Sequence, residues 1–279
     1  MNLSAPQTRG LRFESVTFKY PGAAEPALRD VSFVVAPGEC LAVLGANGSG
    51  KSTLAQLANG LVLPSEGSVT VDGVATAESP DPYEVRSRVG VVFQNPDDQI
   101  VGTVVEEDVA FGPENLGVDP VVMRERVDRA LARTGLAGLE RREPHLLSGG
   151  QKQRLAIAGI LALEPDYLVL DEPTAMLDPR GRVDVLAILE EQRLDGRGLV
   201  HITHHVADIA TADRVLVLAA GSVLFLGDPV ELLERPNRLR ELGLAVPPVL
   251  ELAEELRRLG IVVPPKSVTA ESIVSALCA

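Results

Sequence analysis

Gly45-Ala46-Asn47-Gly48-Ser49-Gly50-Lys51-Ser52 is the stretch of this sequence that decides the fold, because it matches the pattern G-x-x-x-x-G-K-[ST]. The apolar run Cys40–Leu44 before it predicts a buried strand, and the apolar spacing across Leu54–Leu61 after it predicts a helix. A strand, a glycine loop and a helix in this order form a phosphate-binding loop, since the loop N–H groups and the positive end of the helix face the anion. The stretch therefore predicts an α/β fold that binds a nucleoside triphosphate.

The side chains of this loop have distinct expected tasks. Lys51 would bridge the β- and γ-phosphates of ATP, and the hydroxyl of Ser52 would ligate Mg²⁺. A glycine-rich turn that contains a lysine by chance is the alternative, and the strand before the loop and the helix after it argue against that alternative. The residues expected to contact the nucleotide here are Gly45, Asn47, Gly48, Ser49, Gly50, Lys51, Ser52 and Thr53.

A second segment, Tyr167–Leu170 followed by Asp171-Glu172, predicts a buried strand that ends in two carboxylates. Asp171 at the strand tip can hold Mg²⁺ through water, and Glu172 can polarise the water that attacks the phosphate. Taken alone, the segment is equally consistent with an ordinary acidic turn after a strand. Together with the phosphate loop, the two carboxylates predict hydrolysis of ATP.

The rest of the chain predicts the layers around this core. Residues 11–36 alternate apolar and polar side chains on either side of the turn Pro21-Gly22, as antiparallel strands do. Helical spacing dominates from about residue 95 to residue 163, and again over 182–194. Further strands are predicted over 69–74, over 199–202 and, as a hairpin with a tight turn at Gly221-Ser222, over 215–226. We predict a P-loop NTPase core with an antiparallel β subdomain and an inserted helical subdomain.

The composition changes after Pro236, and we place a domain boundary there. An ATP-binding domain would span residues 1–235, and a small C-terminal helical extension would span 236–279. The last helix of the extension is predicted to begin at about Ala270, with Thr269 as its N-cap. The first helix of the extension is amphipathic. Its apolar face is expected to consist of Val249, Leu252, Ala253, Leu256 and Leu259.

Composition narrows the class of protein. The 279 residues carry a formal net charge of −13, which repels a phosphate backbone and disfavours a general nucleic-acid binder. Cys40 and Cys278 stand at opposite ends of the chain and form no metal or redox spacing, which fits a reduced, cytosolic protein. Residues 1–10 lack the apolar stretch of a signal peptide, and Val215–Leu226 is shorter than the ~20 residues that cross a bilayer. Work at a membrane would therefore require other subunits.

A third motif, Leu147-Ser148-Gly149-Gly150-Gln151, opens a predicted helix over 151–163. In isolation, Ser148 is most simply interpreted as a helix N-cap. The phosphate loop, this motif and the Asp-Glu pair nevertheless follow one another as in the ABC ATPase family, which the chain resembles over roughly residues 11–235. The resemblance implies that Ser148, Gly149 and Gly150 contact the γ-phosphate held by the loop of a second subunit. Each ATP would then be shared across a head-to-tail pair.

The same resemblance assigns further residues. Tyr20 stands where the family places an aromatic ring that stacks on adenine, although a tyrosine at a strand end is the alternative. Gln94 matches the glutamine that senses Mg²⁺ and relays to the transmembrane partner, and Leu177-Asp178 matches the loop that crosses the dimer interface. His204 matches the switch histidine that contacts the γ-phosphate. The expected catalytic residues are then Lys51, Glu172 and His204, the expected Mg²⁺ ligands are Ser52, Gln94 and Asp171, and His145, His201 and His205 are interpreted as structural or solvated.

Two segments narrow the resemblance to one group. Phe93–Ile100 and Val105–Asn115 look like the energy-coupling factor (ECF) group, the paired ATPases of vitamin and transition-metal uptake systems, in which Met176–Pro179 is common. The C-terminal tail is similar to the extension that helps those ATPases dimerise. The resemblance implies ATP and Mg²⁺ as cofactors, a second ATPase subunit of the same or a related sequence, a transmembrane scaffold and a substrate-binding membrane subunit. It implies a peripheral position at the cytoplasmic face of the cell membrane, without nucleic acid as a partner.

Other roles within the ABC family are weaker alternatives. An ATPase subunit of another ABC importer or exporter is the runner-up. DNA-repair and chromosome-maintenance members carry long coiled-coil insertions, and translation factors of this type carry two ATPase domains, whereas this sequence has neither feature. A regulatory subunit that binds ATP without hydrolysing it is disfavoured by Glu172 and His204.

Overall fold

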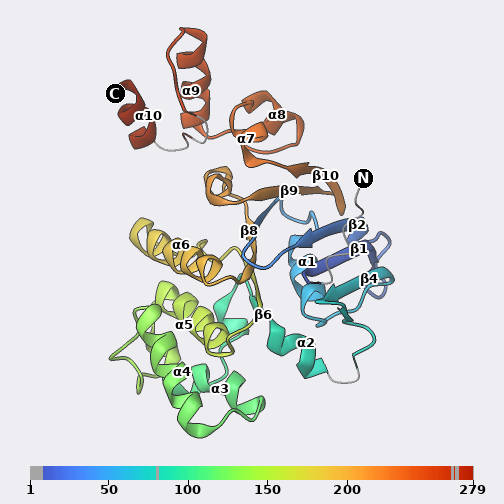
Figure 1. Ribbon diagram of the computed structural model, residues 1–279, viewed down its shortest axis with the longest axis vertical. Coiled ribbons are helices and arrows are strands. Elements are labelled where there is room, and N and C mark those ends of the chain that lie inside the picture. Colours follow the sequence, from blue (N-terminus) through green and yellow to red (C-terminus); the bar gives the residue numbers. More distant parts are fainter. Residues whose placement is uncertain (1–8, 80–81, 265–266, 268–269, 279) are drawn as a thin grey trace.

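The computed structural model describes residues 9–79, 82–264, 267 and 270–278, and the strands within these residues form two sheets (Figure 1). The strands are β1 (Leu11–Phe18), β2 (Leu28–Val35), β3 (Cys40–Leu44), β4 (Glu66–Val71), β5 (Val74–Ala75), β6 (Val89–Val92), β7 (Tyr167–Asp171), β8 (Gly198–Thr203), β9 (Arg214–Ala219) and β10 (Ser222–Gly227). One sheet has the antiparallel order β2-β1-β4-β5, and the other has the order β10-β9-β3-β8-β7-β6. The predicted α/β fold class is confirmed.

The helices cover the larger sheet and form a lobe beside it. The α-helices are α1 (Lys51–Ala58), α2 (Pro82–Arg88), α3 (Val105–Asn115), α4 (Pro120–Arg133), α5 (Gly149–Ala162), α6 (Pro179–Leu194), α7 (Pro229–Leu233), α8 (Pro236–Glu241), α9 (Pro248–Arg258) and α10 (Ala270–Leu277). Short 3₁₀ turns lie at Pro96–Asp98, Pro144–Leu146 and Val206–Thr211. Helices α3, α4 and α5 make the inserted helical lobe at the lower left of Figure 1, opposite the antiparallel sheet.

The antiparallel sheet explains an irregularity in the apolar pattern of β1. Leu11, Phe13, Val16 and Phe18 are all buried, although the step from Phe13 to Val16 is three residues rather than two. The pairing of β1 with β2 shifts register between Phe13 and Val16, and Ser15 has a φ of 46° at this bulge. The extra residue at the bulge turns the side chains after it back toward the core. Leu11, Phe13, Val16 and Phe18 therefore all point inward.

The larger sheet brings three segments that carry predicted site residues to one edge. Strands β3, β7 and β8 are adjacent and parallel, with Leu44 paired to Thr203 and Asp171 paired to Ile202. All three strands are buried along their whole length, as in sheets covered by helices on both faces. Because the strands are parallel, the phosphate loop after β3, Glu172 after β7 and His204 after β8 emerge at the same edge.

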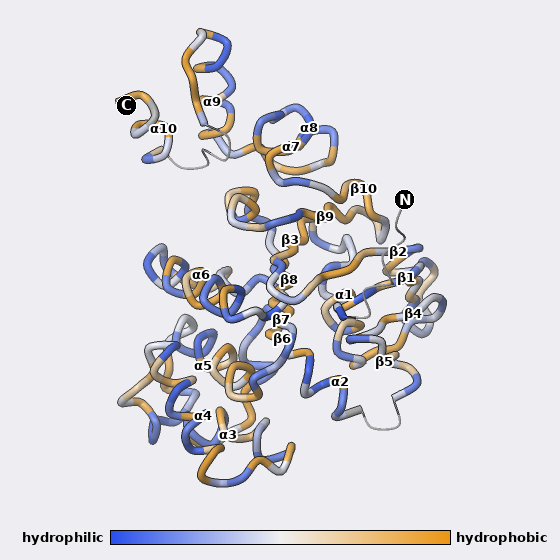
Figure 2. Tube along the Cα trace, viewed as in Figure 1, coloured by the Kyte–Doolittle hydropathy of each residue, from blue (hydrophilic) through white to orange (hydrophobic). Residues whose placement is uncertain are grey.

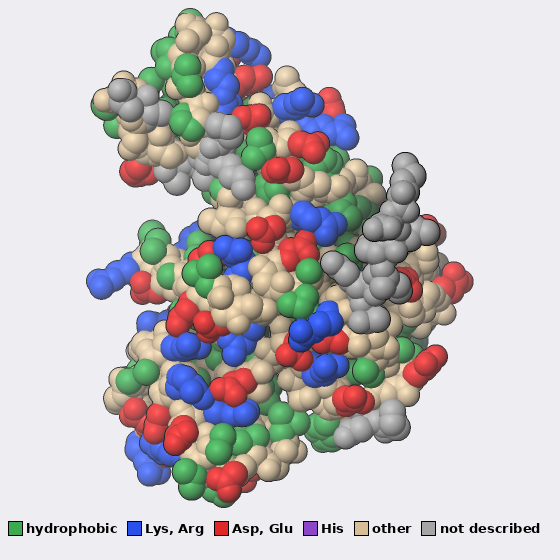
Figure 3. Space-filling view, viewed as in Figure 1, with side chains coloured by type: hydrophobic (Ala, Val, Ile, Leu, Met, Phe, Trp, Pro, Cys, Tyr) green, Lys and Arg blue, Asp and Glu red, His purple; other side chains and the backbone are tan. Residues whose placement is uncertain are grey.

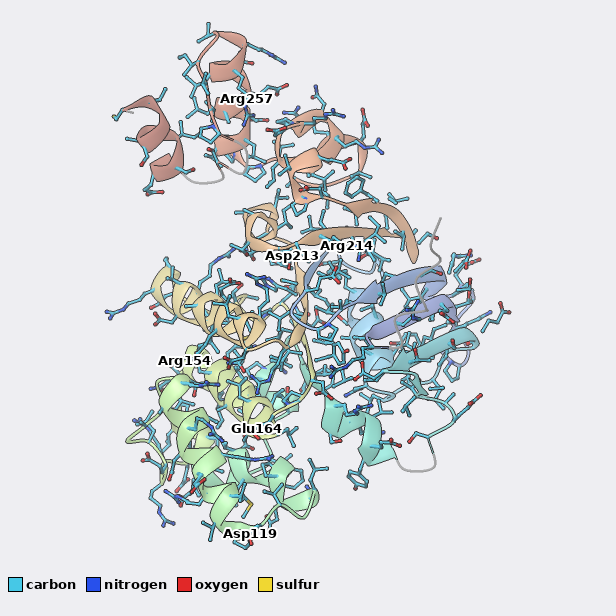
Figure 4. The ribbon with its side chains drawn as sticks, in the orientation of Figure 1. Asp119, Arg154, Glu164, Asp213, Arg214 and Arg257 are labelled. Carbon is cyan, nitrogen blue, oxygen red and sulfur yellow. The ribbon has the colours of Figure 1, made fainter. Side chains whose placement is uncertain are left out.

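Helices α4 and α5 of the lobe are joined by capping, ion pairs and apolar packing. Asp119 caps α4, since its Oδ1 accepts a hydrogen bond of 2.9 Å from the Val121 N–H. Glu164, which follows α5, lies 2.9 Å from Arg126 and 2.8 Å from Arg129 of α4. Figure 4 labels Asp119 at the lower end of this lobe and Glu164 higher up, on the side of the lobe toward the sheet. Since these ion pairs are partly exposed, apolar packing of α3, α4 and α5 supplies most of the stability of the lobe.

Several local predictions require correction. Helix α1 ends at Ala58, so Leu61 lies beyond it and is half exposed. The strand predicted over 69–74 is divided between β4 and β5 by a turn at Asp72-Gly73, where both φ angles are positive. The predicted hairpin over 215–226 is confirmed as β9 and β10, although its turn lies at Ala220-Gly221.

The C-terminal extension also differs in detail from its predicted pattern. In α9 the buried residues are Leu250 and Ala253, whereas Leu252 is 50% exposed and Leu259 is 77% exposed. The apolar face was therefore assigned wrongly in part, because leucine spacing alone does not reveal which side of a helix meets the core. The predicted cap Thr269 lies outside the described residues. The boundary at residue 236 stays a prediction, and Leu239 of α8 joins the main core cluster.

Surface and interior differ as expected for a globular chain. Figure 2 shows hydrophobic residues along the strands in the middle of the molecule and hydrophilic residues on the outer turns of α4, α6 and α9. On the face in Figure 3, acidic and basic side chains are interspersed rather than gathered into a field of one sign. Among the described helices, none combines the length and the apolar character required to cross a bilayer.

Candidate functional site

The phosphate loop orients its lysine inward. Lys51 is 6% exposed, and its Nζ donates hydrogen bonds of 2.9 Å to the Gly45 carbonyl and 3.0 Å to the Ala46 carbonyl. A buried ammonium needs such acceptors, since burying a charge without partners is costly. The carbonyls therefore hold the cation within the curve of the loop, where its charge faces the space that an anion would occupy.

The glycines of the loop are required for two different reasons. A Cβ at Gly45 would lie 2.4 Å from the Leu218 carbonyl oxygen and 2.4 Å from the Ser49 hydroxyl, so the backbone approach there excludes any side chain. Gly48 and Gly50 have φ values of +78° and +106°, in the left-handed region that glycine adopts at low cost. These features fix the curvature of the loop independently of a ligand.

A buried hydroxyl in the loop fits a phosphate ligand. The Ser49 side chain is almost fully buried, and its Oγ has no hydrogen-bond partner among the described residues. Buried polar atoms are nearly always paired in folded proteins. The unpaired hydroxyl, the inward Lys51 ammonium and the N-terminus of α1 together match the chemistry of a polyphosphate oxygen cluster.

The tip of β7 offers part of a magnesium site. Asp171 is 2% exposed, and burial raises the pKa of its carboxyl, while a hydrogen bond with Ser52 acts in the opposite direction. Mg²⁺ prefers oxygen ligands and commonly takes one or two carboxylates together with substrate phosphates. Within the described residues, no group of three or more His, Cys, Asp and Glu side chains is arranged to hold a metal. Asp171 and Ser52 therefore fit a Mg²⁺ ion that would take further oxygen ligands, phosphate and water among them.

One carboxylate oxygen joins three predicted site residues. The Oε2 atom of Glu172 accepts a hydrogen bond of 3.2 Å from the side-chain amide of Gln94 and lies 3.1 Å from Nδ1 of His204. Glu172 is 8% exposed, whereas the His204 side chain is 47% exposed. Residues from β6, β7 and β8 thus converge on the group expected to act on water, which is the arrangement of an oriented general base.

The backbone of Glu172 adopts an unusual conformation. Its φ is 51°, in the left-handed region that non-glycine residues rarely occupy. The Glu172 N–H donates to the Ile202 carbonyl at 3.0 Å, so the chain beyond β7 stays bound to β8 through this turn. The conformation aims the carboxylate toward Gln94 and His204, and backbone strain of this kind is concentrated at functional sites.

Tyr20 lies at the rim of the same cleft. Its ring meets the Phe18 ring edge-on, with centroids 4.8 Å apart, and its hydroxyl lies 3.1 Å from Thr53 Oγ1 and donates to Gln56 Oε1 at 3.1 Å. The cleft encloses about 370 Å³. It is lined by Tyr20, Ala27, Asn47, Gly48, Gly50, Lys51, Ser52, Thr53, Gln94 and Glu172. Sequence reasoning missed Ala27, which lines the cleft, and Gln56, which accepts the hydrogen bond from Tyr20. Neither residue belongs to a motif.

Ser148, Gly149 and Gly150 lie elsewhere, in a second hollow of about 570 Å³. This hollow is lined by Ser148, Gly149, Gly150, Arg154, Met176, Leu177, Asp178, Arg180, Gly181 and Asp184. Asp178 caps α6, since its Oδ1 accepts from the Gly181 N–H at 2.7 Å. The predicted nucleotide residues are thus divided between the cleft at the phosphate loop and this second hollow.

Ser148 does cap its helix, as the simpler interpretation held. Its Oγ accepts from the Gln151 N–H at 3.3 Å, and the Gln151 side chain accepts from the Ser148 N–H at 2.9 Å. This reciprocal capping box accounts for Ser148 and Gln151. It does not account for Gly149, because a Cβ there would meet no described heavy atom within 4 Å and its φ is not positive. The packing of this chain therefore gives no reason for a glycine at position 149.

Comparison with known families supports one assignment of the fold. The family model described as ABC transporter matches residues 28–175. The chain is 48% identical over 273 residues to the energy-coupling factor transporter ATP-binding protein EcfA1 of Clostridium perfringens, covering 96% of this chain and 97% of the relative. It is 52% identical over 253 residues to the protein of the same name from Symbiobacterium thermophilum, covering 90% and 88%.

Solved structures agree with the sequence relatives. The structure of cbiO1 from Clostridium perfringens, part of the ABC transporter complex cbiONQ, has a TM-score of 0.73 at 37% identity, covering 88% of this chain and 98% of that one. A dimeric post-hydrolysis state of the ATP-binding cassette MJ0796, bound to ADP and Pi, has a TM-score of 0.73 at 28% identity, covering 78% and 98%.

Proposed function

The chain belongs to the ABC transporter family, among the ATP-binding subunits of energy-coupling factor transporters, and from this premise we propose that it hydrolyses ATP to energise uptake of vitamins or transition-metal ions. The observation that carries the proposal is the meeting of Gln94 and His204 on one oxygen of Glu172, beside a phosphate loop. A subunit that only binds nucleotide has no need of a buried, oriented carboxylate at this position.

The proposed mechanism assigns each task to a residue of the cleft. The loop N–H groups and Lys51 would bind the triphosphate, and oxygen atoms of Ser52, Asp171 and Gln94 would hold Mg²⁺. When bound, the ion neutralises charge on the phosphate oxygens. Glu172 orients and polarises water, and His204 keeps the Glu172 carboxylate in position and faces the charge that develops on the phosphoryl group. Positioning and electrostatics supply most of the catalysis in such transfers.

We further propose that two subunits, identical or related, complete each site. The nucleotide bound at the phosphate loop of one subunit would be covered by Ser148, Gly149 and Gly150 of the other. The open space at Gly149 supports this arrangement, because a partner's phosphate needs the room that the chain itself leaves unused. The C-terminal extension would assist the pairing, since Leu252, Leu259 and Val262 are exposed there.

The membrane partners follow from the same proposal. A transmembrane scaffold and a small substrate-binding membrane protein would complete the transporter, with this subunit peripheral at the cytoplasmic face. A groove of about 260 Å³ between α3 and α4, lined in part by Ala110, Pro120, Met123 and Val127, would receive cytoplasmic helices of the scaffold. Glu106, Glu107 and Arg124 also line this groove, and its apolar part suits a helix face docked into it.

Two measurements test the proposed function. The purified chain should hydrolyse ATP in the presence of Mg²⁺, and a tagged chain extracted in mild detergent should co-purify with a multi-spanning scaffold and a small membrane protein. Recovery with membrane proteins of a different kind would assign the subunit to another ABC transporter. Tight ATP binding without any turnover, in the chain alone and in the complex, would contradict the assignment as an ATPase.

The composite site makes a testable prediction for two glycines of α5. Gly149→Ala should lower ATPase activity by about 10- to 100-fold, because a displacement of about 1 Å at a phosphate contact has effects of that size. Gly159→Ala is the matched control, since its added methyl meets only the Asp108 carbonyl oxygen at 3.9 Å. Alanine in place of glycine should leave the thermal stability of both variants unchanged or raise it by up to about 1 kcal/mol. Equal activity in the two variants would argue against contact between Gly149 and a partner's nucleotide.

A further inference from the structure

A partly buried ion pair lies next to the segment that carries His204. Asp208, in the 3₁₀ turn after β8, has a side chain that is 3% exposed, and its Oδ1 accepts from the guanidinium of Arg182 in the first turn of α6. Its other oxygen, Oδ2, accepts a hydrogen bond of 2.8 Å from the Thr203 hydroxyl. Both carboxylate oxygens are therefore used, one by α6 and one by the end of β8.

Thr203 carries the connection onward to the histidines. It is 2% exposed, and while its hydroxyl donates to Asp208 it accepts a hydrogen bond of 3.1 Å from the His205 N–H. The His205 carbonyl accepts from the Asp208 N–H at 3.1 Å, which closes the loop. His204 lies between these anchored residues, and its ring lies against that of His205 with centroids 4.1 Å apart.

The Arg182–Asp208 pair also affects the pKa values of the neighbouring histidines. Burial and the positive charge of Arg182 lower the pKa of His205. Burial also lowers the pKa of His201 in β8, whereas the negative charge of Asp208 raises it. Without Asp208, the partly buried Arg182 cation would lose the carboxylate that pairs with it, which is costly. The carboxylate thus stabilises the one arrangement in which α6 and the His204 segment lie close together.

We propose that Arg182 and Asp208 are positioning residues for ATP hydrolysis, and that their ion pair sets the placement of His204 against Glu172. Neither residue lines the cleft at the phosphate loop, so they act through the Thr203–His205 segment rather than on the nucleotide. Gly181, which precedes Arg182, lines the second hollow, where the proposed second subunit would bind. Because Arg182 belongs to the same first turn of α6, the placement of His204 would depend on a helix start that faces the other subunit. This inference rests on the hydrolytic function proposed above.

The decisive variant is Asp208→Asn, which keeps the size of the side chain and an acceptor for Thr203 but loses the charge that binds Arg182. Its kcat should fall by about 10- to 100-fold, as expected for a misplacement of about 1 Å. Its KM for ATP should stay within about twofold, because the groups that bind ground-state nucleotide are unchanged. Asp208→Glu, which restores the carboxylate, should recover part of the lost kcat.

Asp72→Asn provides the matched control. The Asp72 side chain, 9% exposed, also accepts a hydrogen bond from a hydroxyl, that of Tyr167 at 2.7 Å, and lies 3.4 Å from an arginine, Arg88. Tyr167 begins β7, roughly 13 Å along the strand from Asp171 at about 3.3 Å per residue. Asp72→Asn should therefore leave kcat unchanged while removing an aspartate–arginine pair elsewhere in the chain, where Arg88 keeps Asp166 at 3.3 Å.

The NMR signals of the histidine rings report the placement of His204 independently of ATP hydrolysis. The chain has four histidines, so their ring nitrogen signals can be assigned by single substitutions. Asp208→Asn should shift the signals of His204 and His205 but not that of the exposed His145, and Asp72→Asn should leave the signals of His145, His204 and His205 in place. If Asp208→Asn fails to fold, the double variant Arg182→Gln with Asp208→Asn, which leaves no unpaired charge, takes its place.

The outcomes separate this inference from the proposed function. A fall in kcat with KM retained and the His204 signal shifted supports the positioning role. An unshifted His204 signal, an unchanged kcat, or a loss of kcat matched by Asp72→Asn overturns it. If the unaltered chain and its complex fail to hydrolyse ATP, the proposed function is wrong, whereas the NMR comparison still decides whether Asp208 places His204.

Discussion

Glu172→Gln is expected to lower ATP turnover by about 100- to 10,000-fold, the range lost when a positioned general base is removed. The amide keeps the size of the side chain and an oxygen that can accept from Gln94, so the architecture of the cleft should persist. It cannot take a proton from water or hold negative charge, so the attacking water loses its orientation and polarisation. ATP should still bind, because the phosphate loop and Lys51 are untouched.

A closed dimer that holds unhydrolysed ATP is the second expected consequence of Glu172→Gln. With ATP and Mg²⁺ present, Glu172→Gln should accumulate as a closed dimer that gel filtration separates from the monomer. Glu164→Gln is the control, since Glu164 pairs with Arg126 and Arg129 on the outside of the helical lobe and should leave turnover unchanged. Rapid hydrolysis by Glu172→Gln would remove Glu172 from the mechanism.

Lys51→Ala should weaken ATP binding by about 10- to 100-fold, as expected from hydrogen bonds to a charged group worth about 1.5–3 kcal/mol. The substitution also leaves the Gly45 and Ala46 carbonyls without their donor, so the loop loses part of its internal support. Titration with a fluorescent ATP analogue measures the change in Kd directly.

Lys152→Ala tests whether the loss of ATP affinity in Lys51→Ala is specific to the phosphate loop. Lys152 belongs to α5 and pairs with Asp97 at 2.6 Å, outside the cleft at the phosphate loop, so its removal should leave Kd for ATP unchanged. An unchanged affinity in Lys51→Ala would mean that the nucleotide is held elsewhere. A similar loss in both variants would indicate a general effect of positive charge.

The parts of the fold that could be predicted were those encoded locally. The phosphate loop follows from a short pattern, because glycines and a lysine at fixed spacing dictate both backbone and chemistry. The strands β3, β7 and β8 were predicted from continuous apolar runs, which only a sheet covered on both faces requires. Even the bulge in β1 is visible as a break in alternation between Phe13 and Val16.

What could not be predicted depends on contacts between distant segments. Leu252 and Leu259 of α9 match a helical stripe, yet tertiary packing buries Leu250 and Ala253 instead. The partners Arg182 and Asp208 are 26 residues apart and belong to no motif, so their contact appears only once α6 and the turn after β8 are placed together. Gln94 and His204, both named by resemblance, are likewise brought to one oxygen of Glu172 only by the topology of the sheet.

The left-handed backbone of Glu172 also constrains how this chain can change over time. Such a conformation costs about 1–3 kcal/mol for a residue with a side chain, a large share of the small net stability of a domain. Glycine at position 172 would relieve that cost and end the chemistry in the same step, so selection for heat resistance and selection for turnover oppose each other here. Lineages that abandon hydrolysis should lose this glutamate early, and engineers who optimise stability alone would remove it first.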